Sequence, residues 1–241
     1  MIYQQKLEIP SYLCDEHDRL HAWAAVRLCQ EVTEYHGNAT GIGFNTLLAQ
    51  NRAWVLTRAL YNIYRLPEAF EAVELSTWSR GHNGLVAWRD YRMVDGSGKT
   101  LLTGTSYWPM IDMTTRHVLR LNEVIDGYES HDILATEHRE LQKIKLPDMQ
   151  EPDHAMQRPV AYAMLDHTRH VNNSEYIRLI FDMLHDADFD TMYPFVLELN
   201  YNMETKLGDT LRIAHRRVGN EHFLRIDNSS SLSVSARIAG I

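Results

Sequence analysis

The feature that most restricts the fold of this sequence is a repeat, because the same order of predicted elements occurs twice. Each half shows one apolar helix followed by antiparallel strands joined by short turns. Val26-Arg27-Leu28 matches Ile177-Arg178-Leu179 at an offset of 151 residues, and Trp54-Val55-Leu56 matches Phe195-Val196-Leu197 at an offset of 141. A long helix and a curved antiparallel sheet bury each other's apolar faces. The sequence therefore predicts an α+β fold in which a sheet wraps a helix, twice in one chain.

The elements of the first half follow from apolar spacing and turn signals. A helix is indicated by apolar residues at three- and four-residue spacing from Ala22 to Thr33, and Gly37 and Gly41 are expected to end it. A short helix is expected at 44–50. Asp95-Gly96-Ser97-Gly98 is a strong hairpin signal. Strands are predicted at 2–9, 53–64, 72–79, 85–94 and 99–113, with a turn at 81–84.

The second half begins after a polar stretch, 122–155, which is interpreted as a connector with a short helix near 133–141. A helix then follows, with Asn172 and Glu175 resembling a capping box at its start and an apolar face from Tyr176 to Leu184. Strands are predicted at 159–164, 195–203, 210–218, 222–226 and 232–238. The predicted division is therefore an N-terminal domain at 1–121, the connector at 122–155 and a C-terminal domain at 156–241.

Composition excludes several classes of protein. The net charge is −8, from 24 Lys and Arg against 32 Asp and Glu, which disfavours general nucleic-acid binding. Two cysteines without a CxxC pattern exclude a disulfide framework and a zinc ribbon. With no apolar run of about 18 residues and no secretory-type N-terminus, a cytoplasmic protein without a membrane span is expected. His17 and His21 have a zinc-helix spacing but lack a third ligand, and neither a metal nor a cofactor is predicted.

The segment Leu165-Asp166-His167-Thr168-Arg169-His170-Val171-Asn172-Asn173 concentrates acid, base and amide groups between a strand and a helix start. The outward amides of a helix N-terminus favour negative charge. An acyl-transfer site needs such donors for its oxyanion, and a His or carboxylate to activate a nucleophile. The segment is therefore a candidate catalytic loop. The alternative is a polar loop whose Asp and Asn only make turns and caps.

On these residues the chain resembles the bacterial acyl-acyl carrier protein (ACP) thioesterases that are related to the plant plastid enzymes. That family carries the signature Asp-x-Asn-x-His-Val-Asn-Asn, then a Tyr and an apolar helix, and later a Glu shortly before Gly-Asp. Here the signature falls on Asp166 to Asn173, and the Glu is Glu204, before Gly208-Asp209. Segments of the first half also match the family, namely 53–58, 85–91, Trp108 and Ile111-Asp112. The resemblance covers about residues 2–238. It implies a double hotdog fold.

The resemblance also implies roles for individual residues. Asp166, His170 and Glu204 fall on catalytic positions, while Thr168 stands where the family has Asn. The plant family's Cys beside the Glu is Thr205 here, so a Cys-His mechanism is unavailable, and water or a carboxylate must be the nucleophile. The hypothesis is that His170, paired with Glu204, removes a proton from water, and that Asp166 orients this water or attacks directly. Backbone N–H groups at Val171, Asn172 and Asn173 are expected to bind the oxyanion.

The implied substrate is a fatty acyl-ACP, and the first half is expected to bind the acyl chain through Val26, Trp54, Leu56 and Trp108. An acidic carrier protein requires exposed cations on its partner, and Arg58, Arg169, Arg178 and Arg212 are the candidates. Two alternatives stay open: acyl-CoA hydrolysis on the same fold, and a non-catalytic protein that binds acyl or pantetheine groups. The oligomeric state also stays open, a homodimer included.

Overall fold

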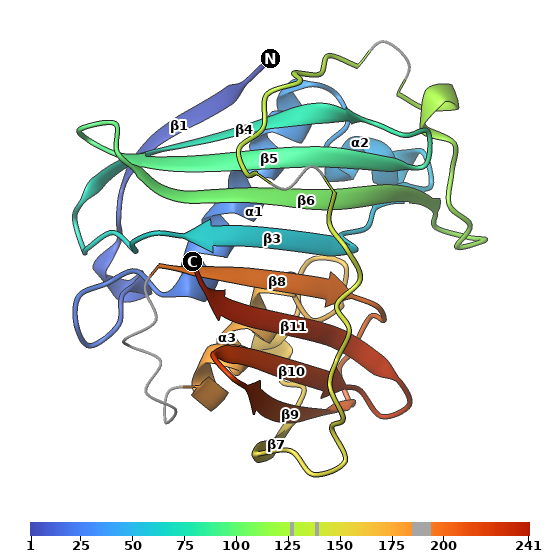
Figure 1. The fold of residues 1–241 in the computed structure, drawn as a ribbon. Helices are drawn as coiled ribbons and strands as arrows, with labels where there is room; N and C mark the ends of the chain where they lie inside the picture. Colours follow the sequence, from blue (N-terminus) through green and yellow to red (C-terminus); the bar gives the residue numbers. More distant parts are fainter. Residues whose placement is uncertain (126–127, 138–139, 185–193) are drawn as a thin grey trace. The chain divides into compact units, whose positions relative to one another are not determined.

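The computed structural model describes residues 1–125, 128–137, 140–184 and 194–241, and these form two compact units, Met1–Leu141 and Gln142–Ile241. Each unit holds one antiparallel sheet and few helices (Figure 1). The boundary lies inside the predicted connector, so residues from both units contribute to that stretch. Each unit is described by itself below.

The N-terminal unit contains a sheet with strand order β1-β4-β5-β6-β3, in which each neighbouring pair is antiparallel, and β2 pairs with β6. Tight turns join its long central strands, as the Asp95–Gly98 signal predicts. The elements in chain order are β1 (Tyr3–Glu8), α1 (Ala22–Ala39), α2 (Phe44–Ala49), β2 (Arg52–Trp54), β3 (Arg58–Ile63), β4 (Ala72–His82), β5 (Val86–Asp95) and β6 (Thr100–Asp112), with single 3-10 turns at Ser11–Leu13 and Leu121–Glu123.

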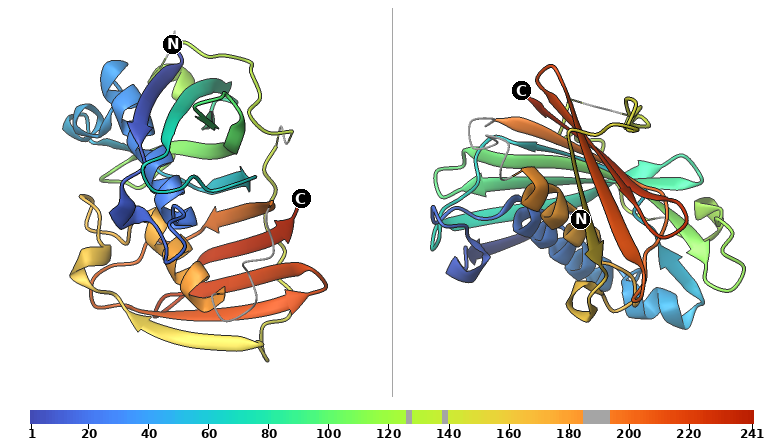
Figure 2. Two further views of the ribbon diagram at one scale, coloured as in Figure 1. Left: turned by 90° about the vertical axis from the view of Figure 1, so that its left-hand side faces the viewer. Right: turned by 90° about the horizontal axis from the view of Figure 1, so that it is seen from below.

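Helix α1 lies on one face of this sheet, as both views in Figure 2 show. Its apolar residues recur every three or four positions, and Ala22, Ala25, Val26 and Cys29 are buried as that spacing predicts. Polar groups also meet at this face. Arg89 on β5 contacts His36 of α1, with Nη1 2.8 Å from Nδ1. The helix therefore covers a face that is mainly apolar but contains a buried guanidinium.

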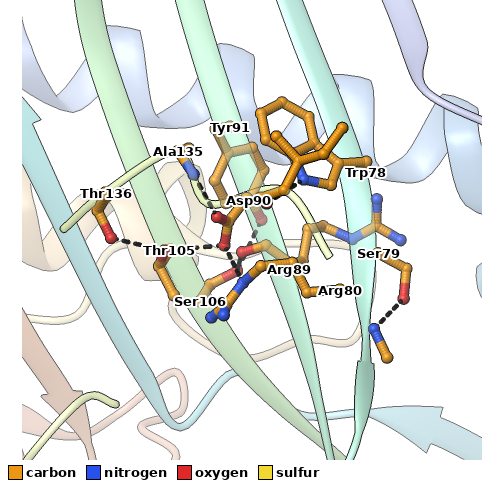
Figure 3. Close-up of polar contacts among 12 residues, drawn as sticks. Trp78, Ser79, Arg80, Arg89, Asp90, Tyr91, Thr105, Ser106, Ala135 and Thr136 are labelled. Carbon is orange, nitrogen blue, oxygen red and sulfur yellow. Dashed lines mark hydrogen bonds and ion pairs between the residues drawn. The ribbon is translucent and has the colours of Figure 1, made fainter. Parts of the chain in front are cut away.

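The opposite face of the sheet binds the chain that follows β6 through buried polar groups (Figure 3). The Asp90 carboxylate is fully buried and accepts hydrogen bonds from Thr105 Oγ1 and Ala135 N, both at 2.8 Å. Arg80 Nε donates to the same carboxylate, also at 2.8 Å. Trp78 Nε1 donates to the Ile133 carbonyl at 2.9 Å. These bonds fix the start of the connector as part of the N-terminal unit.

The C-terminal unit repeats the arrangement, with strand order β8-β11-β10-β9-β7. Helix α3 packs on β8, where the rings of Phe181 and Phe195 lie 6.0 Å apart and those of Tyr176 and Tyr201 lie 6.2 Å apart. The elements are β7 (His154–Pro159), a 3-10 turn (Tyr162–Met164), α3 (Asn173–Leu184), β8 (Phe195–Tyr201), β9 (Thr210–Val218), β10 (Glu221–Asp227) and β11 (Leu232–Gly240).

Three predicted boundaries in the N-terminal unit and the connector are corrected. Helix α1 continues through Gly37 to Ala39. Position 37 is a glycine because a Cβ there would come within 3.2 Å of Gly43 Cα, and Gly41, with its positive φ, comes after the helix. The predicted strand 53–64 is two strands, because the chain leaves the regular ladder at 55–57. The short helix expected at 133–141 is absent from the described part of that segment; positions 138–139 lie outside the described residues.

In the C-terminal unit the predicted strand at 159–164 is wrong. The strand β7 ends at Pro159, and a 3-10 turn occupies Tyr162–Met164. Proline lacks the N–H that the ladder needs, so it is tolerated at the end of this edge strand. The repeat also shifts. Leu20 N bonds the Pro67 carbonyl and Val171 N bonds the Thr205 carbonyl, so the offset there is 138 residues rather than 141.

Candidate active site

The candidate catalytic loop, residues 165–171, is a closed turn in the C-terminal unit between the 3-10 turn and α3. Leu165 and Val171 form an antiparallel bridge, and Asp166 N donates to the His170 carbonyl at 2.9 Å. Arg169 reverses the chain with φ of 66°, a left-handed conformation that is uncommon for a residue other than glycine. Backbone hydrogen bonds within the loop therefore stabilise its conformation in addition to the side-chain contacts described next.

The Asp166 carboxylate holds the inside of this turn. Its Oδ1 accepts hydrogen bonds from Thr168 N at 2.8 Å, from Thr168 Oγ1 at 2.6 Å and, more weakly, from His170 N at 3.4 Å. This is the Asx-turn pattern, in which a short carboxylate replaces backbone partners. Asp166 thereby fixes the positions of the two residues that follow it in the candidate site.

His170 lies between two oxygen atoms. Its Nδ1 is 3.1 Å from Thr168 Oγ1, and its Nε2 is 3.3 Å from Glu204 Oε2. Glu204 follows β8, and the neighbouring residue Thr205 accepts the Val171 N–H at 2.9 Å, which ties the two segments together. The His170 side chain is 19% exposed, so the imidazole is sheltered but reachable. The structure thus brings together all four residues that the sequence predicted: Asp166, Thr168, His170 and Glu204.

The three amides predicted to bind an oxyanion have different partners. The Val171 N–H donates to Thr205 and the Asn172 N–H donates to Met164, both within the fold at 2.9 Å. Neither amide is available, so this part of the prediction is corrected. Asn173 begins α3, and first-turn amides of a helix lack intrahelical acceptors. Only Asn173 keeps the predicted role as a candidate.

The start of α3 is capped by Asn172. Asn172 Oδ1 accepts the Ser174 N–H at 2.9 Å, as expected of an N-cap residue. The Asn172 N–H, which is the donor in the second half of a capping box, donates to the Met164 carbonyl, and Glu175 accepts from Arg178 Nε at 2.9 Å. Thr205, at the position of the plant Cys, is fully buried, and its hydroxyl lies 3.0 Å from Ser233 Oγ. The Thr205 side chain is therefore committed to the core, while its carbonyl holds the catalytic loop beside Glu204.

The four residues predicted to contact an acyl chain all lie in the N-terminal unit. Val26 is buried on α1, and Leu56 is buried between β2 and β3. Trp54 packs against a cluster formed by Leu47, Met110, Leu121 and Ile125. Trp108 on β6 donates its Nε1 hydrogen to Ser106 Oγ at 2.7 Å. These positions are consistent with core packing as well as with a binding surface.

One related feature was missed by the sequence reasoning: the candidate catalytic loop has a counterpart in the N-terminal unit. Residues 14–20 form the same closed turn, with Cys14 bridged to Leu20 and Asp15 Oδ1 accepting the His17 and Arg19 amides at 2.9 Å. The signal was present in the sequence, because Asp15 lies 151 residues before Asp166, which is the offset of the matched helices. We call residues 14–20 the counterpart loop.

Within the described ranges, no group of three or more His, Cys, Asp or Glu residues is placed to hold a metal ion. His17 lies 3.8 Å from Glu16, and the His21 ring stacks on Trp23. No helix in the described part of the chain has the length and apolar character needed to span a membrane.

Comparison with solved structures defines the fold class. The chain is similar to an acyl-ACP thioesterase from Bacteroides thetaiotaomicron, with a TM-score of 0.87 and 23% identity, covering 99% of this chain and 97% of that one. It is equally similar to the 12:0-ACP thioesterase from Umbellularia californica, with a TM-score of 0.88 and 21% identity, covering 99% and 96%. Both comparisons show a shared hotdog-like fold.

The sequence comparisons then give the family. Models of the acyl-ACP thioesterase N-terminal and C-terminal domains match residues 1–128 and 147–238, so the chain belongs to the acyl-ACP thioesterase family. A chloroplastic oleoyl-ACP thioesterase 2 of Arabidopsis thaliana is 27% identical over 230 residues, 86% of this chain and 60% of that protein. A chloroplastic palmitoyl-ACP thioesterase of Gossypium hirsutum is 24% identical over 260 residues, 96% and 62% respectively. The chain thus spans about three fifths of the length of these relatives.

Proposed function

We propose that this protein hydrolyses the thioester of fatty acyl-ACP to a free fatty acid and the carrier protein. The observation that carries the proposal is the placement of His170 between Thr168 and Glu204, in a chain of this family. A general base needs to be within hydrogen-bond reach of the proton that it removes, and a partly exposed imidazole meets this need. Acyl-CoA hydrolysis and non-catalytic binding are the alternative outcomes of the test below.

In the proposed mechanism, water attacks the thioester carbonyl carbon while His170 Nε2 removes one of its protons. Glu204 Oε2, 3.3 Å away, then pairs with the imidazolium that forms. The tetrahedral oxyanion receives a hydrogen bond from the Asn173 N–H. The C–S bond breaks, and the leaving thiolate of the phosphopantetheine arm takes the proton from His170. One water is consumed, and an acid and a thiol are released.

In this scheme Asp166 helps to orient the attacking water and does not itself attack the thioester carbonyl carbon. Its Oδ1 already accepts three hydrogen bonds from Thr168 and His170. Such bonds stabilise a carboxylate and lower its nucleophilicity. An Asp166→Asn enzyme with near-normal turnover would exclude both roles. We also expect Thr168→Ala to lose less activity than His170→Ala, and equal losses would make Thr168 a full replacement for the family Asn.

We further propose that each unit is a hotdog in which the sheet wraps its helix, and that the N-terminal unit receives the acyl chain. The buried contacts of Val26, Trp54 and Leu56 support this role, because an acyl chain requires an apolar lining. Trp108 is the fourth candidate. Widening this surface with Trp54→Ala should move the preferred substrate to longer chains without abolishing turnover of all of them.

For carrier docking, the four candidate arginines are not equivalent. Arg58 Nη1 donates to the Leu141 carbonyl at 2.7 Å, and Arg178 is paired with Glu175 and Asp182. Arg169 and Arg212 are exposed. We therefore expect charge reversal at Arg169, within the catalytic loop, to raise KM for acyl-ACP more than reversal at Arg178. A cytoplasmic location and a homodimer stay predictions from the sequence.

The test is release of free fatty acid from a panel of acyl-ACPs of different chain length, with wild type and His170→Ala measured side by side. Turnover by the wild type that His170→Ala lacks supports the proposal, and the panel gives the chain-length preference. Turnover only on acyl-CoA at matched concentration changes the substrate. Stoichiometric binding of both thioesters without turnover would make the protein a binder.

A further inference from the structure

We propose that the Thr168 hydroxyl fixes His170 in the tautomer that carries its hydrogen on Nδ1 and thereby leaves Nε2 bare, as a base requires. Thr168 is then a positioning residue, because it acts through His170. The catalytic consequence rests on the proposed function, whereas the tautomer itself is a property of the protein without substrate. The inference follows from where one hydroxyl hydrogen must lie.

The first step is the short contact between Thr168 and Asp166. Thr168 Oγ1 lies 2.6 Å from Asp166 Oδ1, a separation typical of an O–H donating to an ionised carboxylate. A hydroxyl has one hydrogen and two lone pairs. The Thr168 hydrogen is therefore directed at Asp166, and the other side of its oxygen can only accept.

The second step concerns the ring of His170. Its Nδ1 lies 3.1 Å from the same Thr168 oxygen, which is hydrogen-bond distance. Since that oxygen can only accept here, Nδ1 must carry the hydrogen. A neutral imidazole has one N–H, so Nε2 presents its lone pair 3.3 Å from Glu204 Oε2. Two acceptors at this distance need a hydrogen donor, and a water that donates one hydrogen to each, as the attacking water of the proposed mechanism would, supplies it. In the other tautomer the hydroxyl would have to turn to Nδ1, which would leave two acceptor oxygens 2.6 Å apart without a hydrogen between them.

The third step is the rigidity of Thr168. Its backbone N–H donates to the same Asp166 oxygen at 2.8 Å, so both ends of the residue are fixed on one carboxylate. A β-branched side chain also has few rotamers. The family's Asn can accept from a ring N–H through its amide oxygen, so Thr168 can supply the same acceptor with a different group. Replacing the family's Asn by Thr168 then changes the accepting group from an amide to a hydroxyl but keeps a hydrogen-bond acceptor for His170 Nδ1.

The experiment is nitrogen-15 NMR of protein labelled at histidine, with the His170 signals assigned by their loss in His170→Gln. Spectra across pH identify the neutral ring and show which nitrogen carries the hydrogen. We expect an Nδ1–H tautomer in the wild type. In Thr168→Val, which keeps the shape but has no hydroxyl, we expect a shift toward Nε2–H, because that hydrogen can then donate to Glu204. Thr168→Ser should restore the wild-type tautomer.

The chain offers a matched control at Ser97. Its N–H and Oγ both contact Asp95 Oδ1, at 2.9 and 2.6 Å, so Ser97→Ala removes the same kind of hydroxyl from the same kind of turn in the N-terminal unit. We expect Ser97→Ala to leave the His170 spectrum and the turnover unchanged. Thr168→Val should lower kcat about 100-fold with little change in KM, and Thr168→Ser should regain most of it.

Two results would overturn the inference: an Nε2–H tautomer in the wild type, or an unaltered His170 spectrum in Thr168→Val. If Thr168→Val does not fold, as judged by circular dichroism, Thr168→Ala is measured in its place with the same expectations. Because the spectra need no substrate, an Nδ1–H tautomer in a protein without thioesterase activity would reject the proposed function and keep this inference.

Discussion

The candidate catalytic loop of the C-terminal unit and the counterpart loop of the N-terminal unit have nearly the same backbone. Asp15 N donates to the Arg19 carbonyl at 2.7 Å, as Asp166 N does to His170 at 2.9 Å. The residue that reverses the chain has a positive φ in both, 58° at Asp18 and 66° at the equivalent Arg169. This fold evidently needs the turn twice, once at the start of each helix.

The side chains on the two loops differ where the proposed chemistry lies. Arg19 stands at the position of His170, and its Nη2 contacts Asp15 Oδ2 at 3.3 Å. Leu66 stands at the position of Glu204, because the next residues, Pro67 and Thr205, accept equivalent hydrogen bonds. The counterpart loop therefore has the carboxylate that holds the turn, but it has no base at the position of His170 and no carboxylate at the position of Glu204. The shared aspartate is therefore assigned to the structure of the turn, and His170 and Glu204 are assigned to the proposed hydrolysis.

The strongest way to break this comparison is His170→Arg, which gives the catalytic loop the residue of its counterpart. We expect kcat to fall about 1,000-fold or more, because a guanidinium cannot accept a proton from water. The fold should persist, since Arg19 shows that this turn accommodates arginine beside its aspartate. Turnover of acyl-ACP and thermal unfolding measure the two effects. Arg19→His is the control and should keep wild-type turnover; retention of a tenth of the activity in His170→Arg would remove His170 from the mechanism.

The next largest effect is expected at Glu204. Replacing it with Gln keeps the size of the side chain but removes the charge that stabilises the imidazolium 3.3 Å away. We expect kcat to fall about 10- to 100-fold, less than for His170→Arg, because the base is retained. Steady-state kinetics on one acyl-ACP measure it. Glu68→Gln, the same exchange at an exposed residue of the equivalent segment in the N-terminal unit, is the control and should keep wild-type turnover. A loss as large as that of His170→Arg would show that Glu204 does more than pair with the ring.

How far the sequence predicts these loops depends on the range of each contact. Asp166, Thr168 and His170 lie within five residues, so a local motif is sufficient to group them. The proximity of Glu204 needs the β8 strand to return beside the loop, and it was predicted only through a family resemblance. The 2.6 Å contact that orients the Thr168 hydroxyl depends on a rotamer, which no spacing rule gives. The occupied amides of Val171 and Asn172 were missed for a different reason, because their acceptors are backbone carbonyls outside the loop, at Thr205 and Met164.

The fold shows the same dependence on range. Apolar periodicity placed α1 and α3 at the offset of 151, because each helix face is a local pattern. The strand β7 was misplaced because it is an exposed edge strand whose alternate residues carry little apolar signal. The interruption between β2 and β3 arises because the three residues 55–57 lie opposite only two residues of β6, Trp108 and Pro109, a mismatch that the sequence of 53–64 alone does not reveal.

Each unit also buries one histidine with a strongly shifted pKa, which extends the comparison to stability. Burial, together with the charge of Arg89, lowers the pKa of His36 to about 4. Burial, with the neighbouring His222, lowers the pKa of His215 to about 4. The unfolded chain, in which a histidine has a pKa of about 6.5, binds more protons in this window. Stability is therefore lost as the pH falls from about 6.5 toward 4.

We expect each of these histidines to reduce the free energy of unfolding by about 2 kcal/mol between pH 7 and pH 5. Urea unfolding at the two pH values measures this loss, and His36→Gln and His215→Gln should each flatten the pH dependence by their own share. Hydrogen exchange would assign each share to its unit. An unchanged pH dependence in both variants would mean that other groups control the acid sensitivity.

The smallest expected effect is the most specific to the comparison, because it concerns the aspartate that both loops share. Although burial opposes the shift, the Arg19 and His17 amides hold the pKa of Asp15 below its usual value, so its carboxylate stabilises the turn at neutral pH. Asp15→Ala should lower the free energy of unfolding by about 1 kcal/mol, as loss of a capping carboxylate does, and leave kcat unchanged. Asp166→Ala should show a similar loss of stability together with a large loss of kcat. A fall in kcat for Asp15→Ala as large as that for Asp166→Ala would mean that the counterpart loop also takes part in the reaction.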